Sequence, residues 1–298
     1  MYPRAFEYFA PQSVTEAISL LSDYGEEAKL LAGGQSLIPL MKLRLANPRC
    51  LVDIGRLEEL AYVREDGAFL LIGALTPHAY VLASQLTRAQ WPLMTDAMSA
   101  IGDSQVRNWG TVGGALAEAD PAGDWGPVAL ALNAEIRCRS LNGARTFPAE
   151  RFFIDAYTPA LRVDELITEV AFPVPAPGST GAYLKLERRA GDFAVISVAV
   201  QLVLDEKEIC RSAVIALGAA GLTPIKVVEA GERLAGKELR PDVIEEAAEK
   251  VFQAAEPFSD VRGTQEYKRA AARALFKRAV AAAVRRFRGE AVEAGHVI

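Results

Sequence analysis

The sequence predicts an α+β protein, with two small α/β units followed by a C-terminal sheet that helices cover. Up to about residue 172, short apolar strand patterns alternate with helix patterns. Three prolines and a glycine then crowd into residues 173–178, which is typical of a linker. Beyond the linker, three strand patterns come in succession and three helix patterns follow. We therefore expect domains at residues 1–57, 58–175 and 176–298.

The first unit is predicted to begin with a capped helix. Ser13 precedes the helix pattern of residues 14–24, and Glu16 follows it at the spacing of a capping box. Apolar runs at 28–31 and 51–54 predict two buried strands. Between them lies a short helix pattern, for which Ser36 is a candidate N-cap. No G-x-G-x-x-G motif follows a strand, and this disfavours a Rossmann fold.

The rest of the chain supplies two further sets of elements. Asn142-Gly143 is a pair favoured in hairpin turns. In the second unit, the patterns predict strands at 69–74 and 134–139 and helices at 77–83, 92–101 and 127–132, and the stretch 166–173 ends the unit. In the C-terminal domain, they predict strands at 182–188, 196–204 and 212–217, and helices near 224–234, 241–255 and 265–288.

The last predicted helix is strongly basic, and a tail follows it. The stretch from Glu266 to Arg288 holds eight basic residues against one acidic residue. Such a stretch is either a solvated helix face or a surface that docks another subunit. The tail beyond it, which includes His296, is predicted to fray.

Composition excludes several classes of function. The chain is 51% apolar and 24% charged, as is usual for globular proteins. Its net charge of −5 argues against a nucleic-acid partner. The three cysteines are far apart and form no C-x-x-C motif, so no disulfide framework, zinc site or iron–sulfur site is predicted. We find no secretory leader and no apolar run of membrane-spanning length, and therefore expect a cytoplasmic protein without an integral membrane segment.

Two glycine-rich stretches are the candidate functional motifs. Residues 32–36 read Ala-Gly-Gly-Gln-Ser, directly after a predicted strand, and residues 111–114 read Thr-Val-Gly-Gly. Glycines without a Cβ let a phosphate approach the backbone N–H groups closely. Taken alone, either pair is also what a plain turn after a strand contains. The two pairs together, each with polar neighbours, favour a phosphate-bearing ligand.

These motifs resemble those of a known family. The stretches AGGQS and TVGG are similar to the two flavin motifs of the FAD-binding medium subunit of molybdenum hydroxylases, the carbon monoxide dehydrogenase and xanthine dehydrogenase family. The resemblance runs from Phe6 to about Arg269. It implies a two-part FAD-binding α/β domain, related to that of vanillyl-alcohol oxidase (PCMH type), and a C-terminal α+β domain with a three-stranded sheet.

The resemblance also implies which residues hold FAD. The first motif would bind the pyrophosphate and line the flavin, and the second would add a hydroxyl and two closely approaching glycines. Two apolar positions would lie near the flavin or adenine. The residues that these roles fall on are Leu30, Leu31, Ala32, Gly33, Gly34, Gln35, Ser36, Leu37, Ile101, Thr111, Gly113, Gly114 and Ile167.

Four further side chains have expectations of their own, and two of them have an alternative. Asp124 would accept hydrogen bonds from the polyol of FAD, or it caps the helix that contains Pro127. Lys185 would lie against the flavin ring, or it is a solvated lysine on an alternating strand. Phe193 would cover the flavin where relatives often carry tyrosine. Glu118, where relatives carry other polar residues, is expected to point away from the phosphates, since two negative charges repel.

No catalytic set of side chains is apparent. The chain has only two histidines, and His78 stands where a helix-start or surface residue is expected. A cofactor that brings its own chemistry is therefore favoured. The family implies electron transfer from a [2Fe–2S] small subunit, fed by a molybdenum-bearing large subunit, to an external acceptor, in a dimer of heterotrimers. The rival hypotheses are a stand-alone FAD-dependent oxidase or reductase and a non-catalytic nucleotide-binding module.

Overall fold

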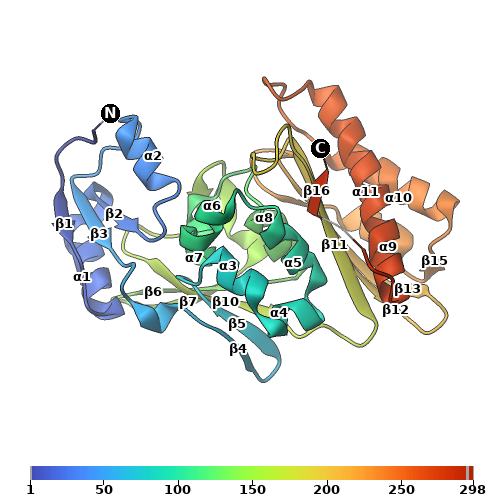
Figure 1. Ribbon diagram of the computed structural model, residues 1–298, viewed down its shortest axis with the longest axis horizontal. Helices are drawn as coiled ribbons and strands as arrows, with labels where there is room; N and C mark the ends of the chain where they lie inside the picture. The colour runs from blue at the N-terminus through green and yellow to red at the C-terminus, as the bar shows by residue number, and fades with distance from the viewer. Residues whose placement is uncertain (1, 293–294, 298) are drawn as a thin grey trace.

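The computed structural model describes residues 2–292 and 295–297 and consists of three sheet-containing units in chain order (Figure 1). The predicted α+β class is confirmed, with a small N-terminal unit, a middle unit and a C-terminal unit whose sheet is covered by helices. In the described part of the chain, no helix is both long enough and apolar enough to cross a membrane.

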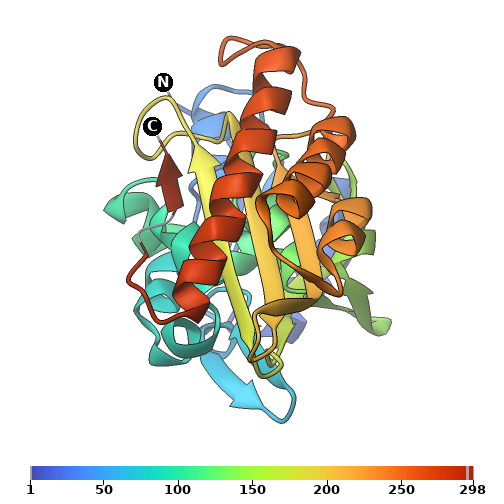
Figure 2. The ribbon, with the colours of Figure 1, turned by 90° about the vertical axis from the view of Figure 1, so that its right-hand side faces the viewer.

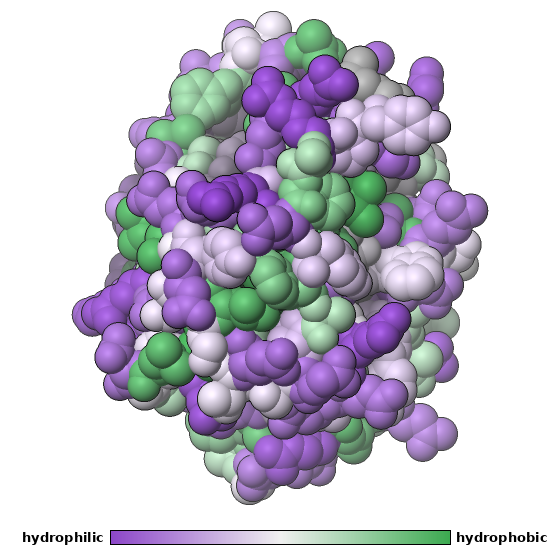
Figure 3. All heavy atoms as spheres, turned by 90° about the vertical axis from the view of Figure 1, so that its left-hand side faces the viewer, coloured by the Kyte–Doolittle hydropathy of each residue, from purple (hydrophilic) through white to green (hydrophobic). Residues whose placement is uncertain are grey.

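The N-terminal unit is a three-stranded parallel sheet with one long helix against it. The helix α1 (Val14–Tyr24) begins at Ser13, whose hydroxyl accepts from the backbone N–H of Glu16 at 3.1 Å, as predicted. Seen from this end, apolar side chains lie among charged ones on the surface (Figure 3). The strands run in the order β1 (Glu7–Phe9), β3 (Cys50–Asp53), β2 (Ala28–Leu31), with η1 (Gly25–Glu27) before β2 and α2 (Leu37–Lys42) after it.

The middle unit is a five-stranded antiparallel sheet with six short helices. Its strands run in the order β4 (Val63–Asp66), β5 (Phe69–Gly73), β10 (Leu166–Pro173), β6 (Glu135–Ser140), β7 (Gly143–Pro148). The helices are α3 (His78–Ala83), α4 (Gln85–Gln90), α5 (Pro92–Ser99), α6 (Ser104–Trp109), α7 (Val112–Glu118) and α8 (Trp125–Ala131). The small elements are η2 (Glu58–Leu60), η3 (Ala149–Arg151) and the paired strands β8 (Phe153–Asp155) and β9 (Thr158–Pro159).

The C-terminal unit has the three predicted strands and three short ones. The long strands are β11 (Ser179–Leu186), β12 (Ile196–Leu204) and β13 (Ile209–Gly218), extended by β14 (Ile225–Lys226), β15 (Lys237–Glu238) and β16 (Gly295–Val297). The helices are α9 (Val228–Leu234), α10 (Pro241–Ala254) and α11 (Gln265–Phe287). Figure 2 shows α11 lying across the sheet, with α10 beside it. The expectation of a frayed tail is wrong, because β16 pairs in parallel with β11.

Both faces of the C-terminal sheet are buried. On β11, Ala182 and Leu184 belong to the core beneath α10 and α11. Tyr183 alternates with them and belongs to the core of the middle unit, together with Ala199 of β12 and Ala216 of β13. Because successive side chains of a strand point to opposite faces, every second residue of β11 faces α5, and Tyr183 among them contacts Asp124 at the start of α8.

The basic residues of α11 are largely paired. Arg273 and Lys277 both contact the carboxylate of Glu245 on α10. Arg286 instead reaches the middle unit, where its two terminal nitrogens contact the carboxylate of Asp96 at 2.9 and 3.0 Å. The basic character of this helix therefore serves contacts within the chain as well as the solvated face.

Candidate functional site

The two glycine-rich segments meet in the fold. A Cβ added to Gly33 would lie 2.0 Å from the carbonyl oxygen of Trp109, just before the second segment. A Cβ added to Gly114 would lie 3.8 Å from the Cβ of Ala32 in the first. These contacts join the N-terminal and middle units. The structure thus brings together the two motifs that the sequence analysis singled out.

The first segment presents a row of backbone donors. Within the described part of the chain, the N–H groups of residues 33–37 donate no hydrogen bond to the protein. Gly34 has a φ of +71°, a conformation that glycine adopts without strain. Successive N–H groups in such a segment form a concave anion site. The donor set therefore fits the pyrophosphate of FAD.

The second segment uses its N–H groups inside the protein. Gly113 donates to the carbonyl oxygen of Ala74 at 2.8 Å, and Val112 donates to that of Thr76 at 3.1 Å. The hydroxyl of Thr111 caps α7 by accepting from Gly114 N–H at 3.2 Å. This segment supports the first, and Gly113 is required chiefly by the close approach of Ala74, the residue just after β5.

The side chains of the first segment lie partly in solvent. Gln35 and Ser36 are exposed, while the others, from Leu30 to Gly34 and Leu37, are half-buried. The Gln35 amide donates to the carbonyl oxygen of Gly33 at 3.1 Å. Ser36 occupies the N-cap position of α2, as expected, but its side chain makes no capping hydrogen bond. Its hydroxyl therefore remains outside the hydrogen bonding of α2.

Asp124 and Lys185 form a buried ion pair. The Lys185 ammonium is 3.3 Å from the Asp124 carboxylate, 3.6 Å from that of Glu187 and 2.7 Å from the carbonyl oxygen of Ala100. Lys185 is 1% exposed, so the alternative of a solvated lysine is wrong. Asp124 stands at the N-cap position of α8 without a capping hydrogen bond, and it accepts instead from the Tyr183 hydroxyl at 2.5 Å.

The electrostatics of this pair reflect its burial. Burial raises the pKa of Asp124, and the ammonium of Lys185 and the hydroxyl of Tyr183 oppose that rise. Burial also raises the pKa of Tyr183 well above its usual value, helped by the neighbouring Asp124. The arrangement places a cation and its carboxylate partner between the middle and C-terminal units.

The remaining predicted residues lie at separate places. Ile101 follows the end of α5 and Ile167 lies in β10, and both are buried in the core of the middle unit. Phe193 is 50% exposed on the loop between β11 and β12. Glu118 is half-buried, and its pKa is raised by burial and by Asp120. The structure therefore gathers the glycine segments together and Asp124 with Lys185, but not all the predicted residues into one contact set.

His78 begins α3, as one expectation had it, but it is not a surface residue. It is 4% exposed, and its Nδ1 accepts from the Trp125 indole N–H at 3.1 Å. Burial lowers its pKa to about 4, with a smaller contribution from Arg107. His78 is therefore neutral at physiological pH and is held as part of the core.

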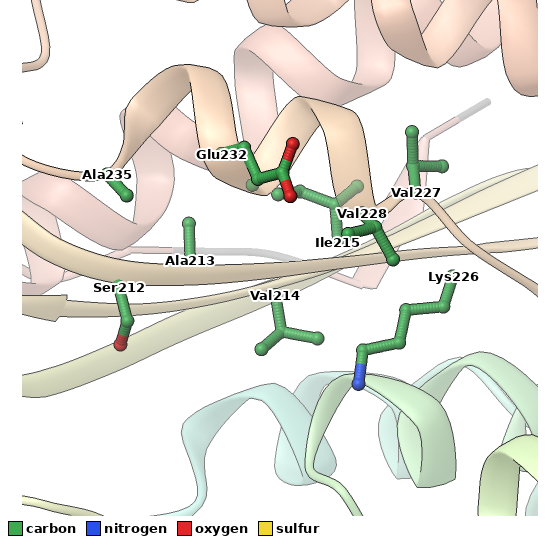
Figure 4. Close-up of a pocket in the computed structure, with 10 residues that line it drawn as sticks. Ser212, Ala213, Val214, Ile215, Lys226, Val227, Val228, Glu232 and Ala235 are labelled. Atoms are coloured by element: carbon green, nitrogen blue, oxygen red, sulfur yellow. The ribbon is translucent and has the colours of Figure 1, made fainter.

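One hollow lies on the C-terminal unit and is unrelated to the glycine segments. Its volume is about 200 Å³, and it lies between β13 and α9 (Figure 4). In the figure, Ala213 and Glu232 lie on the α9 side of the strand, whereas Val214 and Lys226 point to the other side. The lining carries no row of free N–H groups such as residues 33–37 present, so it is no candidate for the phosphate site.

Family comparisons agree with this geometry. Residues 4–175 match the model described as the FAD binding domain in molybdopterin dehydrogenase, and residues 181–283 match the CO dehydrogenase flavoprotein C-terminal domain. The chain belongs to the molybdopterin dehydrogenase flavoprotein family. It is an FAD-binding oxidoreductase subunit of the carbon monoxide and xanthine dehydrogenase type, as the sequence motifs had implied.

Relatives of this flavoprotein extend over nearly its whole length. It is 40% identical to the carbon monoxide dehydrogenase medium chain of Hydrogenophaga pseudoflava, over 95% of this chain and 98% of that one. It is 39% identical to the glyceraldehyde dehydrogenase medium chain of Sulfolobus acidocaldarius, over 94% and 98%. A solved structure of the Hydrogenophaga pseudoflava carbon monoxide dehydrogenase matches with a TM-score of 0.93, covering 96% of this chain and 99% of that chain.

Sequence reasoning missed several residues of the buried cluster. Tyr183 of β11 and Glu187, the residue just after the strand, lie on the same side as Lys185, two residues away from it in either direction. That spacing was visible in the sequence, but nothing there showed that the face is covered. Arg107, which holds the turn after α5, was not singled out either.

Proposed function

We propose that this flavoprotein is the electron-transfer subunit of a molybdenum hydroxylase complex. The observation that carries the proposal is the row of free N–H groups at residues 33–37, beside the second glycine segment, in a chain of this family. FAD, when bound, takes up two electrons and hands them on. The protein would supply the pyrophosphate donors and the buried Lys185 charge at the junction of the two larger units.

The partners follow from the same proposal. A molybdenum-bearing large subunit would hydroxylate the organic substrate, and a small subunit with [2Fe–2S] clusters would deliver the electrons to FAD. An external acceptor would then receive them, in a dimer of heterotrimers in the cytoplasm. The printed names of the relatives support this division of labour, because they describe medium chains or FAD subunits of dehydrogenases.

The proposed FAD contacts remain those implied by the family. Residues 30–37 would hold the pyrophosphate and line the cofactor, with Thr111, Gly113 and Gly114 behind them. Asp124 and Lys185 would act from the unit junction, and Ile101, Ile167 and Phe193 would provide apolar contact. Division into domains at residues 57 and 175 is part of the same proposal.

A stand-alone oxidase is less well supported. Such an enzyme needs an acid–base group beside its substrate. Among the described residues, the single histidine whose side chain can be placed is His78, which is buried, neutral and bonded to Trp125. Within the part of the chain that the structure describes, no histidine is therefore available to deprotonate a substrate beside the flavin.

The test compares the purified chain with the reconstituted complex. The chain alone should show a flavin spectrum and become bleached by dithionite, yet oxidise no aldehyde, purine or carbon monoxide. Adding the two partner subunits should produce turnover of the organic substrate and yield a particle with the mass of two heterotrimers. Steady turnover by the chain alone would support the stand-alone oxidase, and a colourless chain that rejects added FAD would support the nucleotide-binding module.

A further inference from the structure

The turn that follows α5 is held by two cations. The Lys185 ammonium donates to the carbonyl oxygen of Ala100 at 2.7 Å. The Arg107 guanidinium donates through Nη1 to the next two carbonyl oxygens, those of Ile101 at 2.9 Å and Gly102 at 3.1 Å. Three successive carbonyl oxygens are thus engaged by charged donors, whose hydrogen bonds are stronger than those of neutral donors.

The position of these cations has a physical reason. Ala100 is the C-cap residue of α5, so its carbonyl group lacks an intrahelical donor and lies at the negative end of the helix dipole, and Ile101 and Gly102 continue the chain from it. The two cations come from different elements, Lys185 from β11 of the C-terminal unit and Arg107 from α6 of the middle unit. The end of α5 is therefore tied both to the C-terminal sheet and to the helix that leads into the second glycine segment.

The same turn contacts the loop after β11. Gly102 has a φ of +46°, and a Cβ added to it would lie 2.7 Å from the Cβ of Val106. A Cβ added to Gly191 would lie 3.0 Å from the carbonyl oxygen of Gly102. The loop that contains Gly191 also carries Phe193. The placement of residues 100–102 therefore affects both Ile101 and the loop of Phe193.

We propose that Arg107 is a positioning residue of the FAD site. Its guanidinium fixes the turn at residues 100–102, and through this turn it sets the position of Ile101 and of the loop that carries Phe193. This inference rests on the proposed function and adds a residue to it. A cationic donor suits the task, because one nitrogen, Nη1, donates to two adjacent carbonyl oxygens.

The charge of Arg107 also acts in its surroundings. It is the second cause, after burial, of the lowered pKa of His78. The His78 ring in turn lies against Gly110, the residue just before the second glycine segment, since a Cβ added there would lie 2.8 Å from its Nε2. Arg107 thus contacts the turn after α5 directly, and its charge acts on His78, the side chain that packs beside the second glycine segment.

The experiment uses the full chain, stripped of flavin and titrated with FAD. The variants are Arg107→Gln, which removes the cation, and Arg107→Lys, which keeps it. Arg278→Gln is the matched control, because Arg278 is exposed on α11. The readouts are the Kd for FAD, the visible circular dichroism of the bound flavin and the urea midpoint of the apoprotein.

We expect Arg107→Gln to raise the Kd for FAD by about tenfold or more, the scale of a lost charge-assisted hydrogen bond, and to alter the flavin dichroism. Arg107→Lys should recover most of both, and Arg278→Gln should change neither. A Kd for Arg107→Gln equal to that of the control overturns the inference. So does an equal loss of apoprotein stability in both Arg107 variants without rescue of FAD binding. A wild-type chain that takes up no FAD overturns the proposed function itself, and this inference with it.

Discussion

Replacing Lys185 with methionine should test the buried ion pair directly, because methionine keeps an unbranched apolar side chain and removes the charge. Two carboxylates lie 3.3 and 3.6 Å from the ammonium, on Asp124 and Glu187. At an effective dielectric of about 20, each attraction is worth roughly 5 kcal/mol before the cost of desolvation. Removing one member of a buried pair costs about 3–5 kcal/mol net, and we expect Lys185→Met to lower the free energy of unfolding by that amount.

The loss should depend on pH in a defined direction. Without the ammonium, the already raised pKa of Asp124 rises further above its ordinary value of 3.8. Between these two values the folded state binds more protons than the unfolded state, so the stability of the variant falls as pH rises. The difference in unfolding free energy between the variant and the wild-type protein should therefore be small in acid. It should reach its full size above the raised pKa that Asp124 has in the folded variant.

The assay is urea unfolding at about pH 4, close to the ordinary pKa of an aspartate, and at about pH 8, well above it. Adding Asp124→Asn to Lys185→Met should recover part of the loss, since the two side chains are directly coupled. Lys207→Met, in the exposed turn between β12 and β13, is the control and should cost less than about 0.5 kcal/mol. If Lys185→Met costs no more than Lys207→Met at either pH, the pair at the unit junction is not formed and our reasoning fails.

Three further outcomes are expected. Acid precipitation should release FAD to the supernatant, because no His or Cys lies in either glycine motif, and colour retained in the pellet would show a covalent link. Gly33→Ala should abolish FAD binding, and in a calorimetric scan it should lose several times more stability than Gly67→Ala. The Cβ at residue 33 would lie 2.0 Å from a carbonyl oxygen, whereas nothing lies within 4 Å of the Cβ at residue 67. NMR titration should show His78 neutral down to a pH near 4. Because the unfolded state takes up a proton below pH 6.5 and the folded state does not, the free energy of unfolding should fall by about 3 kcal/mol as the pH is lowered from 6.5 to about 4. His78→Phe should not show this loss.

The local elements could be predicted because their signals are local. The capping box of Ser13 and Glu16 specifies where α1 begins, and strand β12 spans the predicted residues 196–204. The short strand β16 carries no such signal. Three residues are too few for a pattern, and its existence depends on β11 offering an open edge.

The site could be predicted only in part, because its residues depend on tertiary packing. Alternation on β11 shows that Lys185 and Leu184 face opposite sides of the sheet. It does not reveal that α5 and α8 cover the side on which Lys185 lies. The glycine motifs present the same difficulty. The sequence suggests that Gly33 and Gly113 make room for phosphate, whereas their backbones are also crowded by Trp109 and Ala74.

The pairing of β16 with β11 has a consequence for handling the protein. A free strand edge presents a row of unpaired N–H and C=O groups and can template association with another chain. Residues 295–297 cover part of that edge, alongside Leu184, Lys185 and Leu186. A chain shortened before Gly295 should therefore lose solubility on concentration rather than its secondary structure. Fusions made at this end need a spacer long enough to leave the strand in its place.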